Sequence, residues 1–367
     1  MKKISEFGIG IIGVASALIL AGCSKSADNG VTPANTQKPE PTMVEGTPQA
    51  GPTTAPSLIS TQTPTPTPAP LATQKPEAST SSMAAISDAY MDAIKITESC
   101  PDVECEKRAA VTYGTVVYKT YDSKTTGQTR GVNIVLPPNY DEAKKYPVLY
   151  LFHGIFGNEY ALINDNNNKI VEISGNLIAE GKAKEMIIVL PNIFAASDKN
   201  LQPGFNVEST AAYDNFINDL TNDLMPFMEE NYSVLTGREN QAVSGFSMGG
   251  REALYIGFTR PDLFGYVLGI APAPGLTPGK DWAMIHPGQM QEEELKIKNS
   301  EEIPYLIMVC CGTKDSVVGT FPKSYHTIME RNEVNHIWYE VPEADHDSNA
   351  IRSGLYNFMT SIFKAEE

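Results

Sequence analysis

Cationic residues are scarce in this chain of 367 residues. Lys and Arg together number 28 against 44 Asp and Glu, which gives a formal net charge of −16 at pH 7. A surface of this sign repels phosphate groups, so it argues against nucleic acid or anionic lipid as a partner. The same acidic balance suits a freely soluble domain.

Histidine and cysteine are also few, at five residues each. No spacing between them predicts a zinc site. Residues 164–168 carry side-chain oxygens at alternate positions, as the start of a calcium loop does, but no Gly or distal Glu completes that motif. We therefore expect a protein that works without a metal or another cofactor.

The N-terminal apolar run is too short to cross a bilayer. It extends from Phe7 to Leu20, follows two lysines and ends in small residues before Cys23. This pattern predicts a signal peptide over residues 1–22, and its ending resembles a bacterial lipobox. We expect a diacylglycerol-modified Cys23 and a protein anchored outside the cytoplasm, with the lipid as its contact with the membrane.

The stretch that follows the signal peptide lacks the residues that build a core. Residues 24–85 contain eleven of the 26 prolines, many Thr, Ser and Ala residues, and no aromatic side chain. Such a segment cannot bury enough apolar surface to fold, and its Thr-Pro repeats favour an extended, semi-rigid chain. We predict a disordered linker over residues 23–85 and one folded domain over residues 86–367.

Four cysteines remain once Cys23 is set aside. Cys100 and Cys105 are close in sequence and are a possible disulfide, because exported proteins retain such bonds. Cys310 and Cys311 lie within an apolar run, where two buried strand residues are a simpler interpretation than a redox pair.

The folded domain alternates strand and helix patterns. Two segments, Val111 to Tyr121 and Gly131 to Leu136, indicate an antiparallel pair. Later strands are continuous apolar runs, as in parallel sheets covered on both faces, and helical patterns separate them, including one from Tyr213 to Asn231. This order predicts an α/β fold with a doubly wound, mostly parallel sheet and an antiparallel N-terminal edge. The expected parallel strands lie near residues 147–152, 186–190, 241–244, 264–271, 304–311 and 337–341.

Ser247 stands between two glycines, in the sequence Gly245-Phe246-Ser247-Met248-Gly249. A short apolar strand precedes this motif, and a helical pattern from Gly250 to Thr259 follows it. Strand, tight turn and helix in this order are typical of a nucleophile elbow, in which the serine oxygen is exposed at the sheet edge. We predict that Ser247 is a nucleophile.

A serine nucleophile needs a histidine to take its proton and an acid to orient that histidine. His346 follows the last expected strand and precedes the last helix, which places it at the same sheet edge as the elbow. Asp315, after the preceding strand, is the first candidate for the acid, and Asp345 and Asp347 are rivals. The other downstream histidines are more simply surface or packing residues: His286, His326 and His336.

Two backbone N–H groups should stabilise the oxyanion that forms when the serine attacks. Met248, directly after the nucleophile, supplies one. The other is expected from Ile155, in the glycine-containing loop after the first buried strand, where His153 is expected to be structural.

Together, these motifs resemble the esterase D group of α/β hydrolases, over about residues 110–365. That group includes the feruloyl and acetylxylan esterases of carbohydrate esterase family one. The resemblance implies the same roles for Ser247, Asp315, His346 and the two oxyanion donors. One departure is Ser348, where many members have tryptophan. The motifs are Leu-Phe-His-Gly-Ile-Phe-Gly-Asn-Glu at 151–159, Gly-Phe-Ser-Met-Gly-Gly at 245–250, Gly-Thr-Lys-Asp at 312–315 and Asp-His-Asp at 345–347.

We therefore expect a serine esterase that removes feruloyl or acetyl groups from plant xylan, so that its partner is an ester-bearing polysaccharide. The insertion at residues 273–300, with Trp282, Met284 and Met290, is a candidate wall of the acyl pocket, and a packing role is equally plausible. A surface peptidase or acyltransferase of the same fold, a thioester hydrolase and a non-catalytic binding protein are the alternatives.

Overall fold

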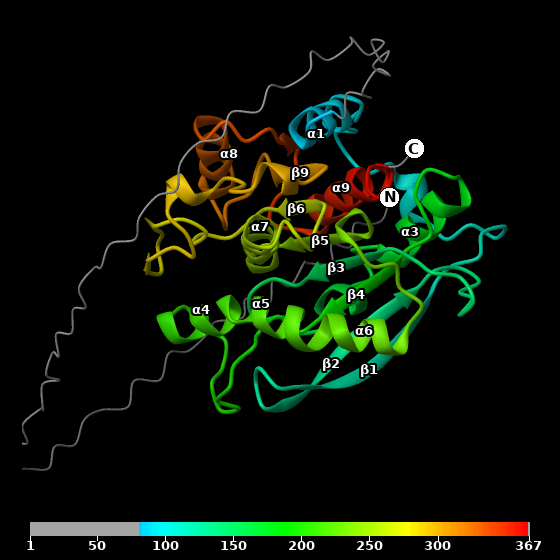
Figure 1. Ribbon diagram of the computed structural model, residues 1–367, viewed down its shortest axis with the longest axis horizontal. Coiled ribbons are helices and arrows are strands. Elements are labelled where there is room, and N and C mark those ends of the chain that lie inside the picture. The colour runs from blue at the N-terminus through cyan, green and yellow to red at the C-terminus, as the bar shows by residue number, and fades with distance from the viewer. Residues whose placement is uncertain (1–80, 366–367) are drawn as a thin grey trace, which may run out of the picture. The chain divides into compact units, whose positions relative to one another are not determined.

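The computed structural model describes residues 81–365 of the chain (Figure 1). The predicted signal peptide, Cys23 and nearly all of the predicted linker lie outside these described residues. Helix α1 (Met83–Asp92) is capped by Ser82, whose side chain accepts a hydrogen bond from the N–H of Ala85. The expected domain boundary at residue 86 therefore falls within a helix.

An eight-stranded sheet organises the described chain, in the order β1-β2-β4-β3-β5-β6-β9-β10. β1 pairs antiparallel with β2, β2 pairs antiparallel with β4, and the remaining neighbours are parallel. The doubly wound α/β-hydrolase fold and its antiparallel N-terminal edge, both predicted from the sequence, are confirmed. The strands are β1 (Thr115–Ser123), β2 (Gln128–Leu136), β3 (Val148–Phe152), β4 (Ile187–Pro191), β5 (Gln241–Phe246), β6 (Tyr266–Ile270), β9 (Leu306–Gly312) and β10 (Ile337–Val341).

Helices cover both faces of this sheet, because successive side chains of its strands point to opposite faces and both sets are apolar. In β3, Tyr150 and Phe152 pack in one apolar cluster, while Leu149 and Leu151 pack in the other. The first cluster lies under α4 (Val207–Asp214), α5 (Phe216–Asp219), α6 (Met225–Asn231), α7 (Met248–Thr259) and α8 (Phe321–Arg331). The second lies under α1, α3 (Ile170–Ala179) and α9 (Ser348–Met359).

The long helix expected near residues 213–231 is divided in the structure. A π-helical turn, η2 (Leu220–Leu224), separates α5 from α6, and Pro226 lies in the first turn of α6. Proline has no N–H to continue the regular hydrogen-bond ladder, which accounts for an irregular turn just before it. Among residues 81–365, no helix has both the length and the apolar character needed to cross a membrane.

The insertion between β6 and β9 contains a two-stranded antiparallel hairpin, formed by β7 (Gly279–Lys280) and β8 (Ile285–His286). The insertion begins directly after β6, which is parallel to β5. It therefore leaves the main sheet at the edge where β5 ends and α7 begins. The hairpin therefore belongs to the surroundings of Ser247.

Candidate active site

Ser247 occupies the sharp turn between β5 and α7, with φ 58° and ψ −117°. These backbone dihedral angles are strained for a residue that has a side chain, so the neighbouring structure must hold Ser247 in this conformation. The N–H of Ser247 donates to the carbonyl of Ile270 at 2.9 Å, and its own carbonyl accepts from the N–H of Ala273 at 3.0 Å. The expected elbow geometry is therefore present, anchored to the end of β6.

Both glycines of the motif are required by close backbone contacts. A Cβ on Gly249 would lie 2.4 Å from the carbonyl oxygen of Phe152, and one on Gly245 would lie 2.3 Å from the backbone of Gly249. These are backbone atoms that cannot move aside as a side chain does. The absence of two side chains thus lets the first turn of α7 pack directly on the ends of β3 and β5.

His346 and Asp315 form a hydrogen-bonded pair beside the elbow. Nδ1 of His346 lies 2.8 Å from Oδ2 of Asp315. The imidazole also packs on the ring of Phe246, the residue before Ser247, with ring centroids 4.3 Å apart. These contacts leave Nε2 as the ring nitrogen available to a reacting group.

The carboxylate of Asp315 is held in its charged form. Burial acts to raise its pKa, but the hydrogen bond from His346 and bonds from backbone N–H groups outweigh that effect, and the pKa is lowered. Oδ1 accepts from the N–H of Val317 at 3.0 Å and of Val318 at 3.1 Å. A neighbour that the sequence did not suggest is Cys311, whose thiol lies 3.6 Å from Oδ2.

The two rival carboxylates contact backbone groups. Asp345 Oδ1 accepts from the N–H of His346 itself at 2.8 Å. Asp347 is the N-cap of α9 and accepts from the N–H of Asn349 at 2.8 Å, so its side chain completes a helix terminus. The acid that meets the imidazole ring is therefore Asp315.

The loop after β3 lies against the serine. A Cβ on Gly154 would be 3.3 Å from Cβ of Ser247, and Ile155 and Met248 line the same pocket as Ser247. Met248 is the first residue of α7, where backbone N–H groups lack partners within the helix and attract negative charge. The two residues expected to donate to an oxyanion thus line one pocket together with Ser247.

His153 holds this loop in place through contacts with backbone groups. It is buried, its Nδ1 lies 2.7 Å from the carbonyl of Gly154, and its Nε2 accepts from the N–H of Ile193 at 3.0 Å. Burial lowers its pKa to about 4. A neutral imidazole with both nitrogens bonded to backbone groups has a structural role.

The pocket at Ser247 is mainly apolar. Trp282 and Met284 of the insertion line it, whereas Met290 is buried in the main core and does not. Ala273 and Pro274, at the start of the insertion, also line it. Its other apolar residues come from loops that follow β3, β4 and β9, namely Ile155, Phe205, Val317 and Val318.

His286, which the sequence suggested was a surface or packing residue, lies in the wall of this pocket. It is buried, and its Nε2 is 3.0 Å from Oδ2 of Asp281. The other oxygen of Asp281 accepts from the N–H groups of Ala283 and Met284 at 2.8 Å each. Asp281 therefore links the turn of the hairpin to strand β8. The sequence signal was an aspartate at a turn followed by a histidine on the returning strand.

A buried charge cluster lies near the start of α7, a few residues after Ser247. Arg251 and Glu252 are fully buried, and the guanidinium of Arg251 pairs with both Glu252 and Asp214. Gln289 of the insertion donates to both carboxylate oxygens of Glu252, at 3.1 and 2.9 Å. Burial acts to raise the pKa of Glu252 despite the nearby arginine. These contacts join α4, α7 and the insertion into one unit.

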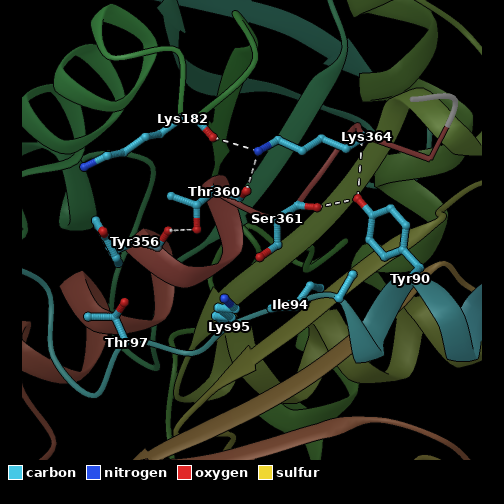
Figure 2. Close-up of a pocket in the computed structure, with 10 residues that line it drawn as sticks. Tyr90, Ile94, Lys95, Thr97, Lys182, Tyr356, Thr360, Ser361 and Lys364 are labelled. Atoms are coloured by element: carbon cyan, nitrogen blue, oxygen red, sulfur yellow. Dashed lines mark hydrogen bonds between the residues drawn. The ribbon is translucent and has the colours of Figure 1, made fainter.

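The other sites in the described part of the chain lack a comparable set of catalytic side chains. Over residues 81–365, no group of three or more His, Cys, Asp or Glu side chains is arranged to hold a metal ion. A separate hollow lies between α1 and α9 (Figure 2), and none of its lining residues lines the pocket at Ser247. There, Tyr90 donates to the carbonyl of Ser361, and Lys364 donates to the carbonyls of Thr360 at 2.7 Å and Lys182 at 2.9 Å. The hydrogen bonds around this hollow connect the first and last helices.

Known proteins are similar to this chain in sequence and in fold. Residues 123–345 match the Esterase family, described as "Putative esterase". The "Endo-1,4-beta-xylanase/feruloyl esterase" of Xylanibacter ruminicola is 31% identical over 219 residues, which are 58% of this chain and 26% of that protein. "Endo-1,4-beta-xylanase Y" of Acetivibrio thermocellus is 29% identical over 153 residues, 39% of this chain and 13% of that protein. The chain thus spans about a quarter or less of these curated relatives.

Among solved structures, a CE1 ferulic acid esterase from Anaeromyces mucronatus, in complex with ferulic acid, superposes with a TM-score of 0.71. The two sequences are 49% identical, and the match covers 75% of this chain and 100% of the esterase chain. The resemblance inferred from the sequence motifs is thereby confirmed. With a family match over more than half of its length, the chain belongs to the esterase family of α/β hydrolases.

Proposed function

We propose that this chain is a serine carboxylic-ester hydrolase that removes feruloyl or acetyl groups from plant cell-wall xylan. One observation carries the proposal: Ser247 lies in a strained elbow beside a His346–Asp315 pair whose separation is 2.8 Å. A serine, a histidine and a buried carboxylate in this order form the constellation used for acyl transfer. The similarity to ferulic acid esterases and to a xylanase/feruloyl esterase supports the substrate class.

In the proposed reaction, Oγ of Ser247 attacks the ester carbonyl carbon while Nε2 of His346 takes the serine proton. The carbonyl oxygen becomes an oxyanion that accepts hydrogen bonds from the N–H groups of Ile155 and Met248. When the carbon–oxygen bond to the alcohol breaks, His346 returns the proton to the leaving oxygen, and an acyl-serine remains. Water, deprotonated by His346, then attacks the acyl-serine. His346 returns this proton to Oγ of Ser247 as the bond to the acyl group breaks and the acid leaves, while Asp315 stays ionised.

The pocket beside Ser247 supports an aromatic acyl group. Phe205 and Trp282 are exposed residues of its lining with ring centroids 5.2 Å apart, and most of the other lining residues are apolar. Flat rings gain most from edge or offset contacts of this kind. We therefore place feruloyl esters ahead of acetyl esters.

Hydrolysis of methyl ferulate, 4-nitrophenyl acetate and acetylated xylan by the full-length protein and its Ser247→Ala variant tests the proposal. We expect methyl ferulate to be the best substrate and the variant to lose at least about 10³-fold in kcat. A folded wild-type protein that cleaves amides but none of these esters would instead indicate a peptidase.

We also propose that the enzyme acts outside the cytoplasm, anchored through a lipid on Cys23. The support is the sequence alone, since the short apolar run ends at Leu20-Ala21-Gly22-Cys23. Expression of a Cys23→Ala variant tests this proposal. Loss of the protein from the membrane fraction is expected, and an unchanged distribution would contradict it.

A further inference from the structure

A second hollow adjoins the acyl pocket but has a different chemical character. We name it the edge groove, a space of about 550 Å³ between the β1–β2 pair, the loop after β3 and the segment that leads to α4. Its volume is within the range of ligand sites, which is about 300–1,000 Å³. Polar side chains dominate its lining, including Arg130, Asn158, Glu159, Asp198, Lys199 and Gln202.

Phe156 stands between the two spaces. It lines the edge groove, and its ring meets that of Phe205, in the wall of the acyl pocket, at a centroid distance of 5.2 Å. Its φ is 63°, a costly conformation for a bulky residue, yet its side chain is 56% exposed. The N–H of Phe156 donates to the hydroxyl of Tyr213 at 3.2 Å, which helps to hold this conformation. Strain that presents an apolar ring to solvent beside an active site indicates a contact with a ligand.

Bare backbone at Gly131 forms part of the groove floor. A Cβ there would lie 2.5 Å from Oε1 of Glu159 and 2.7 Å from the hydroxyl oxygen of Tyr118, so two polar groups converge above this glycine. Within residues 81–365, the Glu159 carboxylate has no hydrogen-bond or ion-pair partner. The Tyr118 ring is 48% exposed and is stacked on Tyr160 at 5.4 Å, which fixes its orientation. A fixed aromatic face next to free oxygen atoms can meet both the C–H and the hydroxyl groups of a sugar.

The charges of the groove favour a neutral ligand. Two cationic side chains, Arg130 and Lys199, are balanced by Glu159 and Asp198. Arg130 is already engaged, because it pairs with buried Asp219 at 3.2 Å and donates to the carbonyl of Phe194 at 3.0 Å. No excess of positive charge remains for a phosphate or a polyanion.

We propose that the edge groove binds the carbohydrate part of the ester, a neutral oligosaccharide of the plant cell wall. This inference depends on the proposed function, because it assigns a place to the other half of the same substrate. In this proposal the aromatic acyl group is assigned to the apolar pocket at Ser247, and the sugar chain extends past Phe156 along the polar groove. Each half of the substrate then meets a surface of matching polarity.

The test compares two substrates that differ in the sugar. We would measure kcat/KM for methyl ferulate and for a feruloylated arabinoxylo-oligosaccharide, with the wild type and the variants Tyr118→Ala and Glu159→Gln. Each variant should lower the ratio of oligosaccharide ester to methyl ferulate by about tenfold, the effect of losing one aromatic contact or one hydrogen bond to a charged group. Methyl ferulate has no sugar to occupy the groove.

Val116→Ala is the matched control, because Val116 is exposed on the same strand as Tyr118 but does not line the groove. Its ratio should equal that of the wild type. If all variants, including the control, lower both activities together, the changes act on the fold and the inference is overturned. It is also overturned if methyl ferulate is cleaved while Tyr118→Ala and Glu159→Gln leave the ratio unchanged. If the folded wild type cleaves neither substrate, the proposed function itself fails.

Discussion

Asp315 reaches the imidazole of His346 with one oxygen and two backbone N–H groups with the other. A carboxylate with both oxygens hydrogen-bonded can hold the ring in one orientation and one tautomer. Replacement by asparagine retains the shape but removes the charge and favours the wrong tautomer. We expect Asp315→Asn to lower kcat by roughly 10³–10⁴-fold.

The matched change is Asp347→Asn, at the carboxylate that caps α9. Asparagine is as good an N-cap as aspartate, so we expect this variant to stay within about twofold of the wild-type kcat. Turnover of an ester by both purified variants decides the assignment. Intact turnover in Asp315→Asn, together with its loss in Asp347→Asn, would refute it.

Gly249→Ala should disrupt the elbow, because the new methyl group would meet the carbonyl oxygens of Phe152 and His153 at 2.4 and 2.6 Å. We expect a loss of at least about 1–3 kcal/mol in the free energy of unfolding and a large loss of activity. Gly127→Ala is the control: its φ is 68° but no atom lies within 4 Å of the new Cβ, so it tests backbone strain alone at about 1 kcal/mol. Equal urea midpoints for the two variants would disprove the role assigned to the close contact.

His153 should make the protein sensitive to mild acid. Its pKa is lowered from 6.5 to about 4 by burial, so between these values the unfolded chain binds a proton that the folded chain does not. Stability must therefore fall as the pH decreases through this window, by about 3 kcal/mol from this residue. In His153→Gln, whose amide oxygen can still accept from the N–H of Ile193, the fall should be smaller by that amount. Urea unfolding from pH 7 to pH 4 measures the difference, and parallel curves for the two proteins would contradict the prediction.

Cys100 and Cys105 are suited to oxidation, since their sulfur atoms are 3.6 Å apart as free thiols. The hydrogen bond from Cys100 and the charge of Arg352 lower the pKa of Cys105 to about 7 despite its burial. Its thiolate should therefore attack oxidised glutathione, and Cys100 should then displace glutathione to close a disulfide. We expect the treated protein to lose two hydrogens and to gain about 2 kcal/mol in stability, because the closed loop is short.

Mass spectrometry after alkylation checks this prediction. Cys310 and Cys311 are buried in β9 and should stay reduced, and Cys105→Ser should not change in mass. Alkylation of both Cys100 and Cys105 in the treated wild type would show that they do not pair.

The sequence predicted those parts of the site that depend on local geometry. The elbow needs a strand, two glycines and a helix within about ten residues, and that pattern is visible in the chain. The order of strands places residues after β9 and β10 at the same sheet edge, which brought Asp315 and His346 forward as candidates. Asp347 could have been set aside earlier, because an aspartate directly before a helix is a common N-cap.

Other features arise from contacts between distant segments. His286 has a place in the pocket wall only because the insertion folds back over β6, and the edge groove joins segments from β1 to the approach of α4. No periodic pattern or motif indicates the groove, and the signal for His286 is limited to the aspartate at the turn before it. The irregular turn between α5 and α6 was missed because apolar spacing continues through it, even though Pro226 was a visible signal.

The hydrogen bonds from Gln289 to Glu252 limit how the pocket at Ser247 can be altered. The insertion that shapes the acyl pocket also satisfies a buried carboxylate on the nucleophile's own helix. Shortening or exchanging the insertion would remove the hydrogen bonds from Gln289 to the Glu252 carboxylate. A buried charged group that loses a partner destabilises the fold strongly. Segments transplanted from related esterases should therefore be accepted only when they supply an equivalent amide or when Arg251 and Glu252 are replaced at the same time.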